Sequence, residues 1–458
     1  MGNIRELVQG FRENHRAFKD ENTAEAVIRQ EYIDRFWILL GWDVHNRRHR
    51  SLAEKDVVVE ANVGTIEGLH IRQRCPDYLF RIDGFPRFIV EAKKCTVDID
   101  KDKDAIFQAK TYAWNAQIPF AILTNFERFR LFDTTVKPHY QAPESEVIAD
   151  FDLKFEDYEQ QWDVIEQTFG REAVADGSLE KLLAKIKHVR AGRRIRGIDR
   201  MLIDLRGSEP VDKAFLAHLE DFRLRITRDL YQENKKAFTE ANTKHGAARL
   251  AEAAQRIVDR LVFIRVCEDR SITSYGELRD AVNAARDNRR ELYPDIVRLF
   301  RRFDERYNGY LFKAHFSEDL TIPPDSLVDF TRSLYLPDGP YRFNVIGDDI
   351  LGIIYERFLG SAITVTRIGF VDAEPKPEVR HAGGVYYTPR FVVDTIVRRV
   401  VGPKIEGKQP AEILDVKILD PACGSGSFLI AALEYLYRHC IKCFDEDPKF
   451  AIVEAKAK

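Results

Sequence analysis

The segment Cys75–Lys94, CPDYLFRIDGFPRFIVEAKK, decides the fold that we expect for the first third of the chain. Two apolar runs flank Asp83-Gly84, a dipeptide that tolerates the positive φ angles of a tight hairpin turn. If the hairpin is centred on Gly84, Asp77 lies opposite Glu91. The segment therefore predicts a β-hairpin with two carboxylates side by side at one end.

A lysine joins these carboxylates. Side chains alternate along a strand, so Glu91 and Lys93 share a face and meet Asp77 at one spot. Two convergent carboxylates repel unless a cation lies between them, and hard oxygen ligands that leave room for water suit Mg²⁺. Such a site can hydrolyse a phosphodiester. An ion-paired surface hairpin without chemistry fits the same residues.

The flanking segments predict an α/β order around the hairpin. Thr23–Trp42 has a helical apolar stripe and carries Glu31, a possible third carboxylate. The helical stretch Asp104–Asn115 places Gln108 and Tyr112 on one face. Strand-like runs occupy Asp56–Glu60, Tyr78–Ile82, Arg87–Ala92, Phe120–Leu123 and Arg128–Phe132.

In this order, the elements P-D, E-A-K and Q-x-x-x-Y resemble the PD-(D/E)xK nuclease fold found in type I and fused type IIG restriction endonucleases. The resemblance covers about 110 residues. It implies that Asp77 and Glu91 bind Mg²⁺ and that Lys93 is the catalytic lysine. It also implies that Glu31 adds a metal ligand and that Gln108 supports the site.

A second motif, DPACGSGSF, runs from Asp420 to Phe428. We expect Lys417–Asp420 to end a strand and Phe428–Tyr437 to form a helix, with the glycines letting the backbone approach a ligand. Leu429 stands where the dinucleotide fingerprint has its third glycine, so NAD(P) is a poor fit.

This string resembles motif I of S-adenosylmethionine-dependent adenine-N6 DNA methyltransferases, and Gly384–Pro389, GVYYTP, resembles their motif X. Thr388 could cap the next helix, with Pro389 as its first residue. The preceding stretch Ile350–Glu356 resembles the helix that opens these domains. The resemblance implies an S-adenosylmethionine pocket lined by Tyr387, Thr388, Pro389, Asp420, Ala422, Cys423, Gly424 and Gly426.

The target-base motif of these enzymes, [N/D/S]-P-P-[Y/F/W], does not occur in the 458 residues; the Pro-Pro pair at Pro323-Pro324 lies between Ile322 and Asp325. We therefore expect the sequence to be an N-terminal portion of a larger protein. Asp445 could be the ribose-binding acid, or could lie in a helical insertion; the sequence leaves that acid unassigned.

Between the two motif regions, long charged helical patterns replace strand signals, and Val371–His381 is expected to be a loop. The fold class is thus α/β multidomain. We predict a PD-(D/E)xK endonuclease domain over 1–155 and a helical connector over 156–345. Residues 346–458 would begin a Rossmann-like methyltransferase domain containing motifs X and I only.

Composition restricts the class of protein. The formal charge is -3, so a DNA surface must come from local clusters such as His45–Arg50 and Lys181–Arg200, which could equally be solvated faces. Six scattered cysteines favour a reducing cytoplasm. Cys440 and Cys443 could bind zinc, but an ordinary pair on a helix is the default. No apolar run predicts a membrane span, and nothing indicates an oligomeric state.

The motif order resembles single-chain type IIG restriction-modification enzymes of the Eco57I/MmeI-like class. That resemblance implies Mg²⁺-dependent, site-specific cleavage of double-stranded DNA plus S-adenosylmethionine-dependent N6-adenine methylation, the latter needing sequence beyond residue 458. Two alternatives remain. One is a modification-only adenine methyltransferase of a phage-defence system with a degenerate nuclease domain. The other is a truncated, non-enzymatic DNA-binding remnant.

Overall fold

The computed structural model describes most of the chain, with gaps. Contacts divide it into two compact units, 1–222 with 258–318 and 322–346, and 223–257 with 319–321 and 347–458. Each unit is described by itself. The residues described are 3–20, 24–50, 55–59, 76–193, 211–240, 243–287, 291–307, 309–346, 361–365, 371–375, 388, 390–423 and 426–446.

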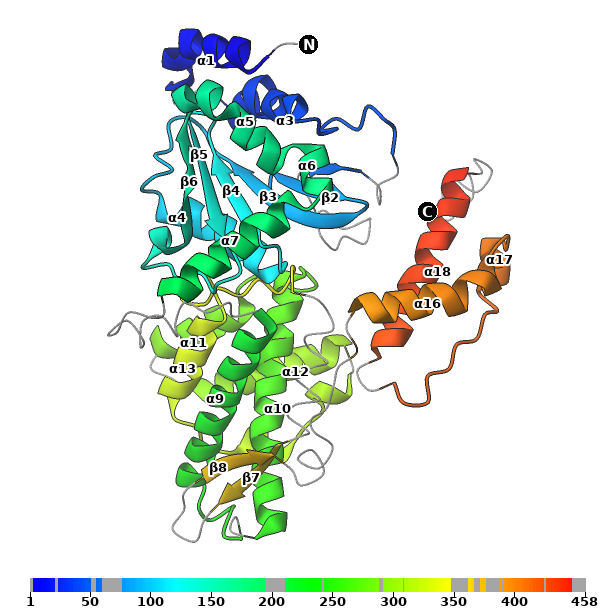
Figure 1. Cartoon of the computed structure of the whole chain (residues 1–458). Coiled ribbons are helices and arrows are strands. Elements are labelled where there is room, and N and C mark those ends of the chain that lie inside the picture. The colour runs from blue at the N-terminus through cyan, green and yellow to red at the C-terminus, as the bar shows by residue number, and fades with distance from the viewer. Residues whose placement is uncertain are drawn as a thin grey trace. The chain divides into compact units, whose positions relative to one another are not determined.

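A six-stranded sheet in the order β1-β2-β3-β4-β5-β6 is the centre of the first unit (Figure 1). β3 and β4 are parallel, and the other neighbours are antiparallel. A parallel pair needs a crossover connection, which here contains the helix α4 (Lys103–Asn115). The strands are β1 (Val57–Val59), β2 (Tyr78–Ile82), β3 (Phe85–Ala92), β4 (Phe120–Thr124), β5 (Arg128–Asp133) and β6 (Val147–Lys154).

The β2–β3 hairpin has the predicted register for a reason that the sequence did not supply. Asp83 and Gly84 both have positive φ, and Ile82 pairs with Phe85, so the turn has two residues. A register shift after Phe80 then inserts one extra residue in β3, and Leu79 pairs with Ile89 as expected. A bulge of this kind changes the pairing by one residue. The expected alignment near Asp77 and Glu91 therefore depends on the bulge.

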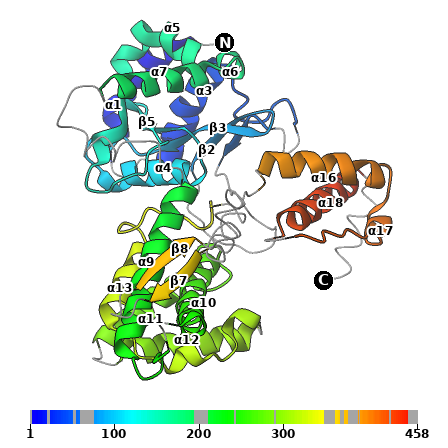
Figure 2. The same ribbon diagram turned by 60° about the horizontal axis from the view of Figure 1, so that its bottom comes forward.

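Helices cover both faces of the sheet (Figures 1 and 2). On one face, aromatic and aliphatic side chains of the N-terminal helices and of the helices after β6 form a large apolar core. α4 covers the other face with smaller apolar clusters. The helices on the first face are α1 (Ile4–Phe18), α2 (Glu25–Ile28), the π-helix η1 (Arg29–Ile33), α3 (Asp34–Leu39), α5 (Tyr158–Phe169), α6 (Arg171–Ala175) and α7 (Ser178–Arg193).

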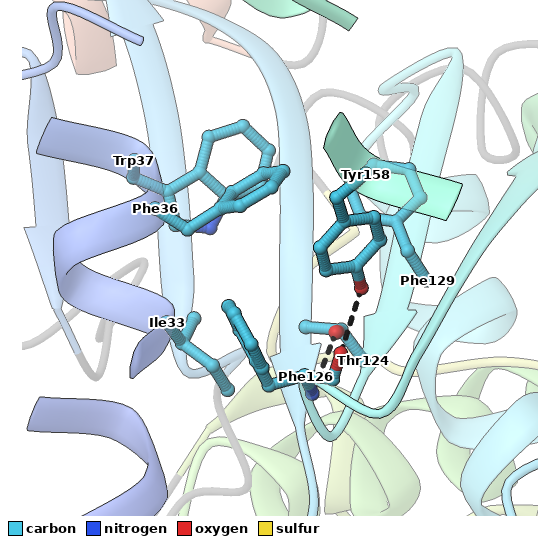
Figure 3. A pocket seen from close by; sticks show the side chains of 7 residues that line it. All are labelled: Ile33, Phe36, Trp37, Thr124, Phe126, Phe129 and Tyr158. Carbon is cyan, nitrogen blue, oxygen red and sulfur yellow. Dashed lines mark hydrogen bonds between the residues drawn. The ribbon is translucent and has the colours of Figure 1, made fainter. Parts of the chain in front are cut away.

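One small cavity lies within this core. Its volume is about 10 Å³, and side chains of η1, α3, β4, the β4–β5 turn, β5 and α5 line it. Figure 3 shows these side chains. Tyr158 closes it by donating its hydroxyl hydrogen to the Phe126 carbonyl at 2.8 Å, and the Phe126 amide donates to Thr124 Oγ1 at 3.1 Å. This volume admits about one water molecule. We therefore exclude it as a substrate site.

A helical region follows in the chain. One of its connecting segments docks on α4: Asn115 Nδ2 donates to the Pro340 carbonyl at 2.7 Å, and the Arg342 amide donates to Asn115 Oδ1 at 3.0 Å. The helices are α9 (Val211–Glu233), α10 (Lys244–Asp269), α11 (Glu277–Asp287), α12 (Leu292–Tyr307) and α13 (Pro324–Ser333). This region also has the 3-10 turns η5 (Tyr310–Phe312) and η6 (Phe316–Asp319).

Two further 3-10 turns flank β6 in the sheet region. They are η2 (Pro143–Glu146) and η3 (Phe155–Asp157).

The second unit contains a small hairpin and a helix pair. In the hairpin, the strands β7 (Ser361–Val365) and β8 (Val371–Pro375) pair antiparallel. Valines of α16 (Arg390–Ile405) pack against α18 (Ser427–Glu446) and the short helix α17 (Pro410–Ile413). These contacts form a separate apolar core.

Two local predictions in the second unit are wrong. Val371–Pro375 is a strand and not part of a loop, because it pairs with β7, a partner that the sequence pattern did not reveal. Lys417–Asp420 is not a strand among the described residues. A strand needs a neighbour to complete its hydrogen bonds, and no described residue pairs with this segment, which leaves Leu419 exposed.

The strands and helices predicted for residues 56–132 are confirmed to within a few residues. The helix expected over Thr23–Trp42 is interrupted by the π-helical turn of η1. The three-part domain division stays a prediction, and Tyr158, Ile165 and Phe169, beyond its first boundary, lie in the core of the first unit. No helix in the described part of the chain is both long and apolar enough to cross a membrane.

A buried ion pair between Lys110 of α4 and Glu146 of η2 should be needed for the stability of the first unit. Lys110 and Glu146 are 1% and 5% exposed, and Lys110 Nζ also donates to the Pro143 carbonyl at 3.0 Å. Lys110→Met leaves Glu146 buried without its cation, so we expect a loss of about 3–5 kcal/mol in unfolding free energy. All four tryptophans precede residue 170, so urea unfolding followed by their fluorescence reports on this region.

The matched control is the double variant Lys110→Met with Glu146→Leu, which removes both charges. We expect it to recover most of the lost stability, because an apolar pair of similar volume often replaces a buried ion pair without loss. Equal instability of the single and double variants would show that the ion pair is not the cause.

Candidate functional site

Asp77 lies just before β2, and a backbone contact fixes its side chain. Its Oδ2 accepts the Ala92 amide hydrogen at 2.7 Å, which ties the start of β2 to the end of β3. Ala92 follows Glu91 directly. The Asp77 carboxylate is therefore held beside Glu91, as the hairpin register predicts.

Glu91, Lys93 and Gln108 meet at the same end of the hairpin. Lys93 Nζ lies 2.6 Å from Glu91 Oε1, and Gln108 Nε2 donates to the same oxygen from α4. Glu91 is only 3% exposed, so both donors contact a carboxylate that is almost withdrawn from water. The structure thus brings together Asp77, Glu91, Lys93 and Gln108 from three elements.

Burial and charge change how these groups titrate. Burial, together with the negative charge of Asp77, raises the pKa of Glu91 to about 7, although Lys93 opposes the shift. The pKa of Lys93 is raised in turn: burial alone would lower it, but the charge and hydrogen bond of Glu91 outweigh burial. Burial and the charge of Asp77 thus make ionisation of Glu91 less favourable, although Lys93 contacts it.

An arginine missed by sequence reasoning contacts Asp77. Arg29 Nη1 lies 3.2 Å from Asp77 Oδ1, and its guanidinium carbon lies 5.1 Å from the ring centroid of Tyr78. The Tyr78 hydroxyl donates to Asp34 Oδ1 at 2.6 Å and accepts from Arg29 Nε at 3.4 Å. Tyr78, Asp34 and Arg29 thus orient the Asp77 carboxylate. Arg29 and Asp34 are five residues apart, a spacing that does not predict a shared helix face, so the sequence pattern did not single them out.

The third carboxylate near Asp77 is that of Glu25, whereas the sequence favoured Glu31. Glu31 is exposed in the π-helical turn of η1. Glu25 is half-buried, and its pKa is raised by burial and then by the charge of Asp77, while Lys93 and Arg29 oppose the shift. The electrostatic neighbourhood of Asp77 thus includes Glu25. Glu25 lies four residues before Arg29, a spacing that places both residues on one face of a helix, and this was the sequence signal that could have indicated it.

A second basic group comes from far along the chain. The positive charge of Arg342 lowers the pKa of Glu91, against the dominant effect of burial. Arg342 Nε donates to Thr111 Oγ1 at 3.0 Å, one turn of α4 after Gln108, and the residue is 7% exposed. With more than 200 residues between Arg342 and Glu91, no local pattern could have indicated this neighbour.

The donor set suits a hard cation better than zinc. No group of three or more His, Cys, Asp or Glu side chains that could hold a metal occurs among the described residues. Mg²⁺ usually retains several waters and needs only one or two protein carboxylates, which Asp77 and Glu91 can supply. Structural zinc needs a closed set of four protein ligands. The placement of these two carboxylates side by side is the feature that fits such a cation.

The glycine loop forms a tight turn before α18. Asp420 Oδ1 accepts the Ala422 amide hydrogen at 3.0 Å, and the Gly426 amide donates to the Cys423 carbonyl at 2.7 Å. Gly426 has φ of +82°, which favours glycine. The turn therefore gathers Asp420, Ala422, Cys423 and Gly426 beside a helix N-terminus. Thr388 is half-buried; Tyr387, Pro389 and Gly424 lie outside the described residues.

The cysteine pair lies on α18, as the default interpretation has it. Cys440 packs against the core of the helix pair, and Cys443 Sγ lies 3.9 Å from the Lys408 carbonyl oxygen. His439 Nε2 lies 3.4 Å from that same oxygen. His439 and Cys443 thus both lie beside the backbone of Lys408. Asp445 is in the last turn of α18, and its role stays unassigned.

Comparison with known proteins connects the two regions. The family model described as Type I restriction enzyme R protein N terminus matches residues 56–140, which contain the carboxylate pair. The family model described as N-6 DNA Methylase matches residues 347–452, which contain the glycine loop. No solved structure matches the chain significantly.

Among curated proteins, the chain is 28% identical over 451 residues to the Type II restriction enzyme and methyltransferase RM.Eco57I of Escherichia coli. The match covers 97% of this chain and 41% of that protein. It is also 40% identical over 137 residues to the Type I restriction enzyme MjaIX methylase subunit of Methanocaldococcus jannaschii, covering 26% of this chain and 20% of that protein. The chain therefore spans less than half of these relatives. The resemblance to restriction-modification enzymes drawn from the motifs is confirmed.

The raised pKa of Glu91 predicts a pH dependence of stability. Its folded pKa is about 7 against an unfolded value near 4.5, so the folded state keeps a proton that the unfolded state has released. Stability therefore falls as pH rises through this window. We expect Glu91→Gln to remove about 2 kcal/mol of that fall between pH 5 and pH 7.

Urea titrations at several pH values, followed by tryptophan fluorescence without divalent cations, measure this slope. Glu31→Gln, at an exposed carboxylate, is the matched control and should keep the wild-type slope. Identical slopes for wild type and Glu91→Gln would contradict a raised pKa at Glu91.

Proposed function

We propose that the chain is the nuclease and cofactor-binding portion of a bifunctional type IIG restriction-modification enzyme. It would cleave double-stranded DNA site-specifically with Mg²⁺ and contribute to S-adenosylmethionine-dependent N6-adenine methylation. The observation that carries the proposal is the convergence of Asp77, Glu91, Lys93 and Gln108 at one end of the sheet. The restriction-enzyme family match over residues 56–140 supports it.

In the proposed nuclease, a PD-(D/E)xK site, Asp77 and Glu91 hold Mg²⁺, which when bound acidifies water and stabilises charge on the phosphodiester. Lys93 Nζ, bonded to Glu91 at 2.6 Å, would position the attacking water and neutralise developing negative charge. Gln108 holds the Glu91 carboxylate from α4, and Arg29 holds that of Asp77. Each of the two carboxylates thus has a neighbouring side chain that fixes its orientation.

For methylation, we propose that the turn from Asp420 to Gly426 binds S-adenosylmethionine together with Tyr387, Thr388 and Pro389. The short turn brings backbone amides near the start of α18, a setting that suits a polar ligand. The match of residues 347–452 to N-6 DNA Methylase supports this assignment. We also keep the three-domain division and a prokaryotic cytoplasmic location as proposals.

The alternatives are a modification-only methyltransferase with a degenerate nuclease domain and a non-enzymatic DNA-binding remnant. A degenerate nuclease should have lost or displaced a member of the catalytic set. Here Asp77, Glu91 and Lys93 are present and held together. That arrangement favours an active nuclease.

Removing the catalytic groups should separate the two activities. Asp77→Asn or Lys93→Ala should lower Mg²⁺-dependent nicking of supercoiled plasmid at least about 100-fold, because metal binding or charge neutralisation is lost. Binding of S-adenosylmethionine by the same chain, measured by calorimetry, should not change. Lys101→Ala, at a lysine that is 85% exposed, is the matched control and should cut normally.

The same experiment distinguishes the alternatives. Full cutting by Asp77→Asn would show that the catalytic assignment is wrong. A wild-type chain that binds S-adenosylmethionine but never nicks DNA would support the modification-only enzyme. A chain that binds DNA and shows neither property would support the remnant.

A further comparison identifies the third carboxylate. We expect Glu25→Gln to slow nicking about 10- to 100-fold, as loss of a group that tunes a metal site does, since Glu25 lies near Asp77 and Lys93. Glu31→Gln should stay within about twofold of wild type on the same scale. The reverse order in plasmid nicking at saturating Mg²⁺ would restore Glu31 as the metal ligand.

A further inference from the structure

A buried carboxylate outside the catalytic set is surrounded by arginines. The Asp56 side chain is 0% exposed, and Arg50 Nη1 lies 2.8 Å from its Oδ1. Arg171 Nε, from α6, lies 2.8 Å from Oδ2, and Arg48 Nη1 lies 4.0 Å from that oxygen. The Arg81 amide donates to the Asp56 carbonyl at 2.7 Å. Burial lowers the pKa of the Arg81 guanidinium, and the charge of Asp56 opposes that shift. Four arginines from three segments thus gather around one carboxylate.

The cluster has more positive charge than its acids neutralise. Arg171 also contacts Glu172 at 2.8 Å, and Asp43 carries a third negative charge. The group therefore has a net charge of about +2. The acids are Asp43, Asp56 and Glu172, and the bases are Arg47, Arg48, Arg50, Arg81 and Arg171.

The loop that supplies most of these arginines is held in one conformation. Asp43 accepts the amide hydrogens of Arg47 at 2.7 Å and Arg48 at 2.9 Å. Asn46 bonds both backbone groups of Arg50, at 2.9 and 3.0 Å. The pKa of Asp43 is lowered: burial alone would raise it, but these amides and the arginine charges outweigh burial. The backbone is thus organised before any ligand binds, which reduces the entropic cost of binding.

Only some of these arginines hold the fold together through ion pairs with Asp56. Arg50 and Arg171 hold the buried Asp56, so they fasten the loop and α6 to the edge strand β1. Arg47 is exposed, and the Arg48 side chain is 53% exposed, 4.0 Å from a carboxylate that already has two closer partners. These two arginines remain available to an anion from solution.

The cluster lies along the strand that leads to the catalytic site. Val57 pairs with Phe80 and Val59 with Tyr78, so Asp56 lies beside Arg81, whereas Asp77 immediately precedes Tyr78. Arg81 lies four residue steps along the chain from Asp77, about 13 Å between their backbones at roughly 3.3 Å per step. Duplex DNA rises about 3.4 Å per base pair on each strand, so this separation is about four base pairs.

We propose that Arg47 and Arg48, carried on the loop fastened by Asp56, bind a backbone phosphate of the DNA duplex whose phosphodiester is cleaved at Asp77 and Glu91. The proposal rests on the proposed nuclease function and deepens it by assigning a DNA contact outside the catalytic set. Arginine donors match phosphate oxygens in bidentate geometry. Phosphate contacts fix the register of a duplex but carry no sequence information.

The test measures DNA binding apart from cleavage. The full 458-residue chain is titrated, in EDTA, against a fluorescent 30-base-pair duplex between 50 and 200 mM salt. The variant is Arg47→Gln with Arg48→Gln, which leaves Arg50 and Arg171 to hold Asp56. We expect binding about 10-fold weaker at low salt and a salt slope smaller by about one to two. A second duplex of unrelated sequence should lose the same affinity.

A matched control changes equal charge elsewhere: Arg5→Gln with Arg12→Gln on α1 should bind like wild type. Unchanged affinity and salt slope in the loop variant would overturn the proposal, as would a loss confined to one of the two sequences. Failure of the two proposals can be told apart. If wild type never nicks DNA but the loop variant still binds weakly, the phosphate contact stands and the nuclease does not. If the loop variant binds normally and wild type nicks DNA, the nuclease stands and the phosphate contact does not.

Discussion

The hydrogen bond from the Ala92 amide to the Asp77 carboxylate is the constraint on which the candidate nuclease site depends. It crosses the open end of the hairpin and holds Asp77 beside Glu91, where two negative charges would otherwise repel. The rest of the site offsets this repulsion: Lys93 and Gln108 contact Glu91, Arg29 contacts Asp77, and the Arg342 charge acts on Glu91. Even so, burial and the charge of Asp77 keep the pKa of Glu91 above its usual value.

Local sequence rules predicted the hairpin and the convergence of Asp77, Glu91, Lys93 and Gln108 because both depend on short-range geometry. Asp83-Gly84 specified the turn, strand alternation placed Glu91 with Lys93, and a helical period placed Gln108 on α4. The expected register was right because the bulge after Phe80 offsets a turn one residue tighter than assumed. Its accuracy near the catalytic end was therefore partly fortuitous, since nothing in the sequence pattern indicated the bulge.

What the sequence could not provide depends on contacts through space. Arg342 comes near Glu91 because its own segment folds against α4, and Glu25 lies near Asp77 although more than 50 residues separate them in the chain. The strand expected over Lys417–Asp420 shows the opposite error. Its apolar pattern is real, but a pattern cannot supply a neighbouring strand, and the described residues leave it unpaired.

The docking of residues 340–346 on α4 bears on how such a chain can be divided into modules. Asn115 bonds both the Pro340 carbonyl and the Arg342 amide, and Val345 joins the apolar cluster beneath α4. A fragment cut after residue 155 would keep Asp77, Glu91, Lys93 and Gln108, yet it would lose Arg342 and the α5 side chains of the sheet core. Recombination at that boundary would therefore transfer the sequence motifs without their complete electrostatic surroundings. A segment that keeps these contacts extends at least to residue 346.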